Sequence, residues 1–291
     1  ELMFNIEYSI STKHNFNGRI YCKTTCNREN IKKVKKSVKE LKIKIITTLK
    51  KDPRILGIGA SGSYASDAMD KYSDLDLVIA VDPADFDDIM TERFNIINSI
   101  EGKIAAFTGE HVGEPRLIIA LYAPHAIHVD YKFVSLPDAA TRVDDTKVLW
   151  EKAQLLTDTF KTKKHQYPSP EPQWVEDRFW IWVHYVATKI ARGEYFEALD
   201  FLSFLRNVVL SPLALQQAGL TPSGVRKIET RLPEFSKKLE LTVAKPEKES
   251  LIIATNKCIE LYLELRECEQ VERNTQAQEM CIAYLEQETQ A

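Results

Sequence analysis

Residues 55–81 read ILGIGASGSYASDAMDKYSDLDLVIAV, and this stretch decides the fold that the sequence predicts. It holds two apolar runs, 55–60 and 77–81, whose lengths and β-branched content are typical of buried strands. Between the runs lie Gly62-Ser63, ten further residues and Asp74-Leu75-Asp76. Because side chains two apart in a strand point the same way, the two aspartates are predicted to project from one face of a sheet.

Two carboxylates side by side repel each other unless a positive charge lies between them. Magnesium does this well, since it is usually held by one or two carboxylates together with substrate phosphates. Gly62 would let the backbone approach a phosphate closely, and Ser63 adds a hydroxyl and an N–H donor. The alternative is an ordinary strand whose mouth carries two solvated aspartates.

The Gly62-Ser63 pair, the ten-residue spacer and Asp74-Leu75-Asp76 resemble the signature of the DNA polymerase β-like nucleotidyltransferase superfamily. Within the superfamily, the residues of this motif are most similar to those of the small bacterial members, including antibiotic nucleotidyltransferases. The resemblance covers about residues 55–134. It implies an α+β fold in which a nucleotidyltransferase-type mixed β-sheet with flanking helices is followed by an all-helical C-terminal domain.

Asp130 is the candidate for a third carboxylate. Residues 127–134 alternate as a strand, and Asp130 shares a face there with His128 and Lys132. The resemblance implies a further acidic residue on a later strand beside the Asp-x-Asp strand, and Asp130 matches this place. The alternative is a strand-end carboxylate paired with Lys132.

From the resemblance, Asp74, Asp76 and Asp130 are expected to be the catalytic carboxylates and to hold two Mg²⁺ ions. Gly62 and Ser63 are expected to contact the nucleotide. One departure concerns Ser66 and Asp67, which stand where small family members have a basic residue and a glycine. It puts in doubt a phosphate contact from that turn and adds a negative charge near the nucleotide.

Three regions are predicted along the chain: an extension of unclear role (1–26), the catalytic domain (27–145) and a helical domain (146–291). The extension contains a weak strand pattern over residues 3–10. The catalytic domain opens with a lysine-rich amphipathic helix to about residue 50, which we interpret as a solvated surface.

The helix predicted over residues 173–192 carries one stripe of cations and aromatic side chains. The stripe would suit a surface that contacts a triphosphate and a flat substrate, and a solvated helix face explains it equally well. The resemblance implies that a lysine of the first helix in the helical domain holds nucleotide phosphates, and Lys189 is the best match by position.

The general base that activates the acceptor is left open by spacing alone. His184 is more simply interpreted as a structural histidine. The candidates are Glu110, Glu114, Asp130, Glu176, Asp177 and His184.

Composition narrows the partners. The 291 residues are 44% hydrophobic and 28% charged, with a formal net charge of −3, which is typical of globular proteins and gives no global reason to bind nucleic acid. The apolar runs look too short to span a bilayer, and no secretion-signal pattern opens the sequence. The five cysteines are scattered, so we expect free thiols in a reducing cytoplasm.

The sequence therefore predicts a metal-dependent nucleotidyltransferase. It would move a nucleoside monophosphate, AMP in the first instance, from ATP or another NTP to a hydroxyl of a small molecule such as an aminoglycoside or a lincosamide, releasing pyrophosphate and conferring antibiotic resistance. The alternatives are transfer to a protein or an RNA end, or a catalytically silent nucleotide-binding module. The oligomeric state is left open.

Overall fold

The computed structural model describes residues 24–290, which belong to two compact units. The sheet unit comprises the chain up to Ala139 together with Thr146–Phe160. The helical unit comprises Ala140–Asp145 and the chain from Lys161 onward. The strand pattern at residues 3–10 and Cys22 lie outside the described residues.

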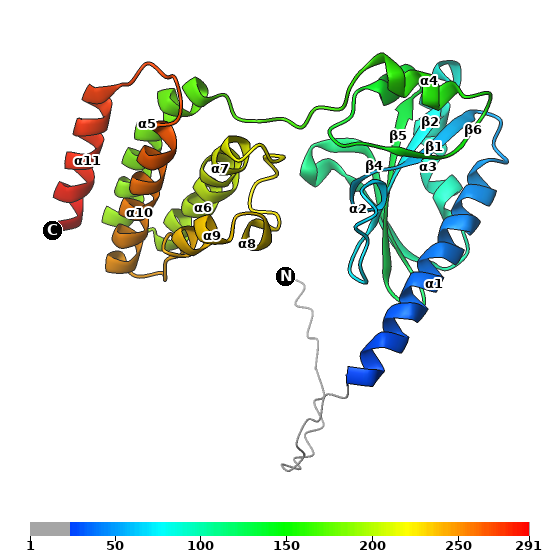
Figure 1. Cartoon of the computed structure of the whole chain (residues 1–291), viewed down its shortest axis with the longest axis horizontal. Coiled ribbons are helices and arrows are strands. Elements are labelled where there is room, and N and C mark those ends of the chain that lie inside the picture. The colour runs from blue at the N-terminus through cyan, green and yellow to red at the C-terminus, as the bar shows by residue number, and fades with distance from the viewer. Residues whose placement is uncertain (1–23, 291) are drawn as a thin grey trace, which may run out of the picture. The chain divides into compact units, whose positions relative to one another are not determined.

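The sheet unit is built on one six-stranded mixed sheet (Figure 1). Its strand order is β3-β4-β5-β2-β1-β6, and every neighbouring pair is antiparallel except β2 and β5, which are parallel. The strands are β1 (Ile55–Ala60), β2 (Leu75–Val81), β3 (Lys103–Gly109), β4 (Glu114–Tyr122), β5 (Ile127–Ser135) and β6 (Lys147–Glu151). Both apolar runs of the quoted stretch are therefore strands, as predicted.

Short and long helices precede, connect and follow these strands. They are α1 (Thr24–Leu49), α2 (Gly62–Ala65), η1 (Pro83–Asp85), α3 (Phe86–Asn98), η2 (Glu110–Val112), η3 (Pro137–Ala140) and α4 (Leu155–Thr162).

The two faces of the sheet pack against different helices. Ile79 of β2 belongs to a core that also contains Ile45 of α1 and residues of α3. The neighbouring Ala80 points to the other face and belongs to a smaller core with Leu156 of α4. Asp76 has the same parity as Ala80. Its carboxylate therefore lies on the α4 side of the sheet, away from α1 and α3.

Strand β6 lies beyond the domain division predicted at residues 145 and 146. It pairs with β1, with Ala60 opposite Lys147. The following helix α4 packs on the same strand, because a Cβ added to Gly57 would lie 2.8 Å from Leu156 Cβ. Residues 146–160 thus complete the sheet unit, whereas the sequence pattern had grouped them with the helices.

The helical unit is all α, which agrees with the predicted fold class. Its core is formed mainly by α5, α6, η4, α7 and α10, and α11 also packs on it. The helices are α5 (Pro172–Ala191), α6 (Tyr195–Phe204), η4 (Leu205–Leu210), α7 (Ser211–Gln217), α8 (Ile228–Arg231), α9 (Pro233–Glu240), α10 (Lys248–Arg266) and α11 (Thr275–Gln290).

One stretch of this unit, Tyr195–Gln217, is long and apolar enough to cross a membrane by length and composition, which the sequence reading did not anticipate. More than half of it is buried inside the unit, as in a core helix of a globular protein. The stretch is not one regular helix. Its middle segment η4 is π-helical and leads into α7, where Pro212 occupies the first turn. The wider π turn accommodates a proline that has no N–H to donate.

Candidate active site

The parallel pairing of β2 and β5 brings two of the predicted carboxylates together. Asp76 lies directly opposite Asp130 in the register, so the two side chains occupy neighbouring positions on the same face. Asp74 immediately precedes β2, and the intervening Leu75 is fully buried on the other face. The alternation predicted for this motif is therefore present in the structure.

Asp130 has a raised pKa, and the causes describe its surroundings. Burial is the largest cause, and the negative charge of Asp74 adds to it. A contact of 2.7 Å between His128 Nε2 and Asp130 Oδ1 opposes both. Because the charge of Asp74 acts on Asp130 and Asp76 lies opposite Asp130, we refer to Asp74, Asp76 and Asp130 together as the acidic group.

The turn after β1 lies against this acidic group. Gly62 has a φ of +60°, and a Cβ built on it would fall under 3.0 Å from Asp76 Oδ2. The Ser61 N–H also donates to the Asp76 carbonyl oxygen at 3.0 Å. Only glycine fits at residue 62 without moving the carboxylate or straining the backbone.

Ser63 supplies an unsatisfied hydroxyl beside that turn. Its Oγ is buried and has no hydrogen-bond partner among the described residues. Buried polar atoms are nearly always paired, so an orphan of this kind calls for an explanation such as a missing ligand or ion.

The departure at Ser66 and Asp67 has a structural reading. Asp67 has a φ of +54°, a left-handed conformation that glycine adopts freely and that aspartate tolerates better than most residues. Its carboxylate is paired with Lys147 Nζ at 3.0 Å. The negative charge of Asp67, which was expected to oppose a nucleotide, is thus balanced by Lys147 of β6. The sequence did not predict that β6 belongs to the sheet.

The residues present suit a divalent cation in the chemistry of their donors. The donors are carboxylate oxygens, which magnesium prefers. Among residues 24–290, however, no group of three or more His, Cys, Asp or Glu side chains is arranged to hold a metal by itself. A cation here would need further oxygens from a bound phosphate, which is how magnesium is commonly held at nucleotide sites.

Two of the candidate bases lie on or next to β4, and both are engaged. The Glu114 carboxylate accepts from Arg116 and pairs with Lys132 at 2.9 Å. Its pKa falls to about 2, chiefly through the Arg116 bond and against the effect of burial. Glu110 accepts a hydrogen bond from Thr108. Lys132, the alternative partner considered for Asp130, is therefore paired with Glu114 instead.

Another candidate, Glu176, is part of a buried network in the helical unit. Its carboxylate accepts from Tyr262, from Trp180 and from the Arg266 guanidinium at 3.1 Å. Burial raises its pKa, but these hydrogen bonds and the arginine charge outweigh that effect and the pKa is lowered. Such a residue holds helices together and has no access to an acceptor.

The two remaining candidates also have local contacts. Asp177 accepts from the side chain of Gln173 at 2.8 Å. The exposed His184 ring lies 4.5 Å from the ring of Tyr284, centre to centre. Of the six candidate bases, Asp130 alone lies in the acidic group around β2 and β5.

Lys189 is held by two carboxylates within the helical unit. Its Nζ lies 2.8 Å from Glu194 and 3.0 Å from Glu197, and 5.0 Å from the centre of the Tyr185 ring. These bonds raise its pKa, so it stays charged. A nucleotide phosphate contacting Lys189 would have to compete with both glutamates.

Sequence reasoning missed two contacts around the acidic group. The His128–Asp130 bond had a visible signal, because the two residues alternate on one strand face. The Lys147–Asp67 pair had none, because it depends on β6 pairing with β1 across nearly ninety residues of chain.

Comparison with known proteins gives a family match over most of the chain. A family model described as streptomycin adenylyltransferase matches residues 35–287. No curated protein sequence matches the chain significantly.

Solved structures that resemble the chain are distant. An aminoglycoside 6-adenyltransferase from Bacillus subtilis has 16% identity and a TM-score of 0.32, covering 85% of this chain and 94% of its own. A nucleotidyltransferase-like protein from Exiguobacterium sibiricum 255-15 has 15% identity and a TM-score of 0.36, with 78% and 75% covered.

Proposed function

Because this chain belongs to the streptomycin adenylyltransferase family and is a nucleotidyltransferase, we propose that it moves AMP from ATP to a hydroxyl of a small cationic antibiotic. The favoured acceptor is an aminoglycoside such as streptomycin, ahead of a lincosamide, and pyrophosphate is the second product. The activity would confer antibiotic resistance in the cytoplasm, where ATP and reduced thiols are present.

One observation carries the proposal for the site. Asp76 faces Asp130 across parallel strands while Gly62 lies against the Asp76 carboxylate, next to the orphan hydroxyl of Ser63. This arrangement offers negatively charged oxygens and a close backbone turn side by side. Magnesium would supply the positive charge that the carboxylates lack, and a triphosphate would supply an acceptor for the turn and the Ser63 hydroxyl.

The residues have separate tasks. Asp74, Asp76 and Asp130 would hold Mg²⁺, two ions in the full arrangement, and bound magnesium neutralises the charge that develops on transferring phosphates. Gly62 and Ser63 orient the nucleotide through the backbone turn and the hydroxyl. His128 fixes one oxygen of Asp130. Lys189 would add a phosphate contact once it leaves its glutamates.

Replacing the first two carboxylates tests this directly. We expect Asp74→Asn and Asp76→Asn to reduce kcat/KM for AMP transfer at least about 100-fold, the upper end of the effect of removing an outer-shell partner. Calorimetric titration with ATP and Mg²⁺ should show the same loss of binding. Asp88→Asn is the matched control, because Asp88 is an exposed aspartate on α3 of the same unit.

Retention of metal-dependent ATP binding by both variants would reject the site. The acceptor is identified separately, by a screen of labelled nucleotides against antibiotics, proteins and RNA ends scored by pyrophosphate release. Label on RNA or protein with none on the antibiotics would replace the proposed acceptor class.

A further inference from the structure

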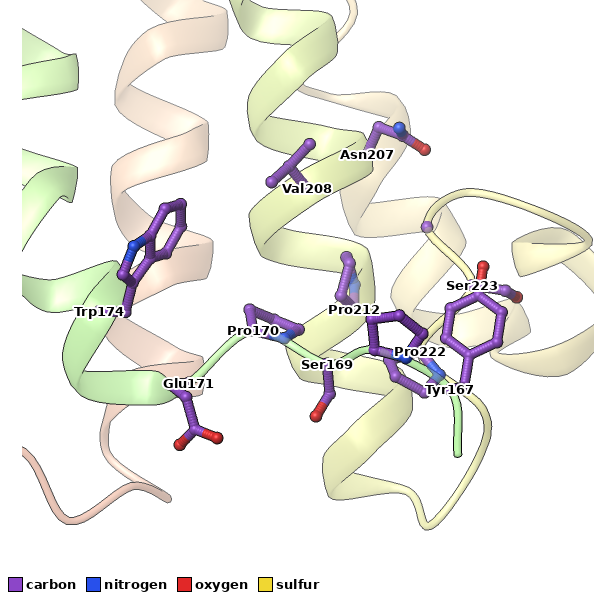
Figure 2. A pocket seen from close by; sticks show the side chains of 12 residues that line it. Tyr167, Ser169, Pro170, Glu171, Trp174, Asn207, Val208, Pro212, Pro222 and Ser223 are labelled. Carbon is purple, nitrogen blue, oxygen red and sulfur yellow. The ribbon is translucent and has the colours of Figure 1, made fainter. Parts of the chain in front are cut away.

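The helical unit contains a cavity of about 720 Å³ that the proposed chemistry does not use (Figure 2). It lies between residues 167–174, which lead into α5, and a wall formed by η4, α7 and residues 222–224. Its volume falls within the range of pockets that bind small molecules.

Residues 222–224, which form part of the cavity wall, are held in place by close packing and hydrogen bonds. Gly224 has a φ of +63°, and a Cβ added there would clash with Asn207 of the π-helical segment η4. Asn207 Oδ1 accepts from the Val225 N–H at 3.3 Å. Arg231 donates to Ser223 Oγ at 2.7 Å. The loop is therefore pinned to η4, and π-helical turns of this kind are frequent at functional sites.

Ring-shaped apolar surfaces dominate the lining. Trp174, which is 40% exposed, lies at one end of the cavity in Figure 2 and Tyr167 at the other, with Pro170, Pro212 and Pro222 between them. Aromatic and proline faces of this type suit the C–H face of a sugar ring.

The charge of the lining selects against anions. No lysine, arginine or histidine lines the cavity, and its one charged lining residue is Glu171. The Glu171 carboxylate has no side-chain partner among residues 24–290. In the view of Figure 2 its side chain extends away from the Trp174 ring, toward the opposite side. A phosphate would find no cation here, whereas an ammonium or guanidinium group would find an unpaired carboxylate.

The Trp174 indole already takes part in a cation–π contact. The Arg178 guanidinium carbon lies 4.4 Å from the ring centre, and Arg178 does not line the cavity. The π-system of this residue thus accepts a cation in the structure itself.

We propose that this cavity binds a cationic sugar ring of the acceptor, with the ring face on Trp174 and the ammonium or guanidinium group beside Glu171. The Asn207 amide nitrogen and the Tyr167 hydroxyl, which have no partner among residues 24–290, provide hydrogen bonds to ring hydroxyls. The inference rests on the proposed function in taking the ligand to be the acceptor. Beyond the proposed function, the inference assigns the binding residues and predicts that binding does not require nucleotide.

The test is calorimetric titration of the full chain with streptomycin, without nucleotide or metal. Trp174→Ala and Glu171→Gln should each weaken binding roughly tenfold, which corresponds to about 1.4 kcal/mol. Trp174→Phe should fall between Trp174→Ala and the unchanged protein. Phe196→Ala and Glu279→Gln are the controls, since both residues are exposed in the same unit and neither lines the cavity.

Two further measurements separate this proposal from the transfer reaction. Asp76→Asn should bind streptomycin like the unchanged protein even when it transfers no AMP. Maltose, a neutral sugar, should bind at least about tenfold more weakly than streptomycin.

The outcomes are distinguishable. If AMP transfer occurs but the Trp174 and Glu171 variants bind streptomycin like the controls, the cavity is not the site and the proposed function stands. If no transfer is found while the variants weaken binding, the cavity stands and the transfer proposal fails. Equal binding of maltose, or no streptomycin binding by the unchanged protein, overturns the inference.

Discussion

The contact between Gly62 and Asp76 makes Gly62→Ala the most informative single substitution in the sheet unit. The new methyl group would lie under 3.0 Å from Asp76 Oδ2, closer than Cβ atoms come to other heavy atoms. Either the turn or the carboxylate has to move. Because Asp76 faces Asp130 in the register, a displaced carboxylate disturbs the whole acidic group.

The size of the effect has two parts. Alanine in a left-handed conformation is disfavoured by roughly 1–2 kcal/mol. For a unit of this size, that lowers the unfolding temperature by about 2–4 °C for each kcal/mol. The second part is local, since moving a ligand carboxylate should weaken Mg²⁺–ATP binding by at least about tenfold.

Gly113→Ala separates the two parts. Gly113 also has a positive φ, +74°, but a Cβ there meets nothing within 4 Å. We expect both variants to lose similar stability in thermal unfolding, and only Gly62→Ala to lose binding in calorimetry with ATP and Mg²⁺. Equal nucleotide binding by the two variants would show that the close approach of Gly62 to Asp76 has no role in the site.

Three further outcomes are expected. Glu176→Gln should destabilise the helical unit by about 3 kcal/mol in urea at pH 7, because it leaves Arg266 buried without a charge partner. Since the folded pKa of Glu176 is lowered, its stabilisation is present above its ordinary pKa and is lost as the pH falls through the folded value; the deficit of Glu176→Gln relative to the unchanged protein should therefore shrink on acidification, and an equal deficit at pH 7 and pH 3 would contradict this. Cys258, whose pKa is raised to about 12 by burial, should react with a thiol reagent only after unfolding, whereas the exposed Cys268 should react in the folded protein. Lys189→Met should raise KM for ATP about tenfold if the lysine contacts phosphate, while Arg192→Met should leave it unchanged; equal KM values would limit Lys189 to its glutamate pairs.

The fold class could be predicted because its signals are local. The apolar runs at β1 and β2 and the alternation at β5 are each contained in fewer than ten residues. The Asp-x-Asp spacing likewise carries its own geometry, since strand periodicity alone puts both side chains on one face.

Features that depend on distant pairing could not be predicted in the same way. Strand β6 is short and half-buried, and its residues show no clean alternation, so its assignment requires knowing that β1 has a free edge. The position of Asp130 opposite Asp76 follows from a parallel pairing that skips two strands in the chain order. For Lys189, the sequence indicates which helix face it occupies. It does not indicate that the following residues fold back so that Glu194 and Glu197 pair with the lysine.

The charges around the acidic group bear on how strongly the reaction should depend on metal. Lys132 is paired with Glu114 and Lys147 with Asp67, so these two neighbouring cations already have carboxylate partners. A triphosphate brought to Asp74, Asp76 and Asp130 would add negative charge near Asp130, whose charged form burial and the charge of Asp74 already disfavour. If both lysines keep these partners, we expect the balancing positive charge to come from bound cations. Nucleotide binding should therefore rise steeply with magnesium concentration, and Asp→Asn substitution in the acidic group should weaken metal binding while easing the repulsion that metal-free nucleotide meets there.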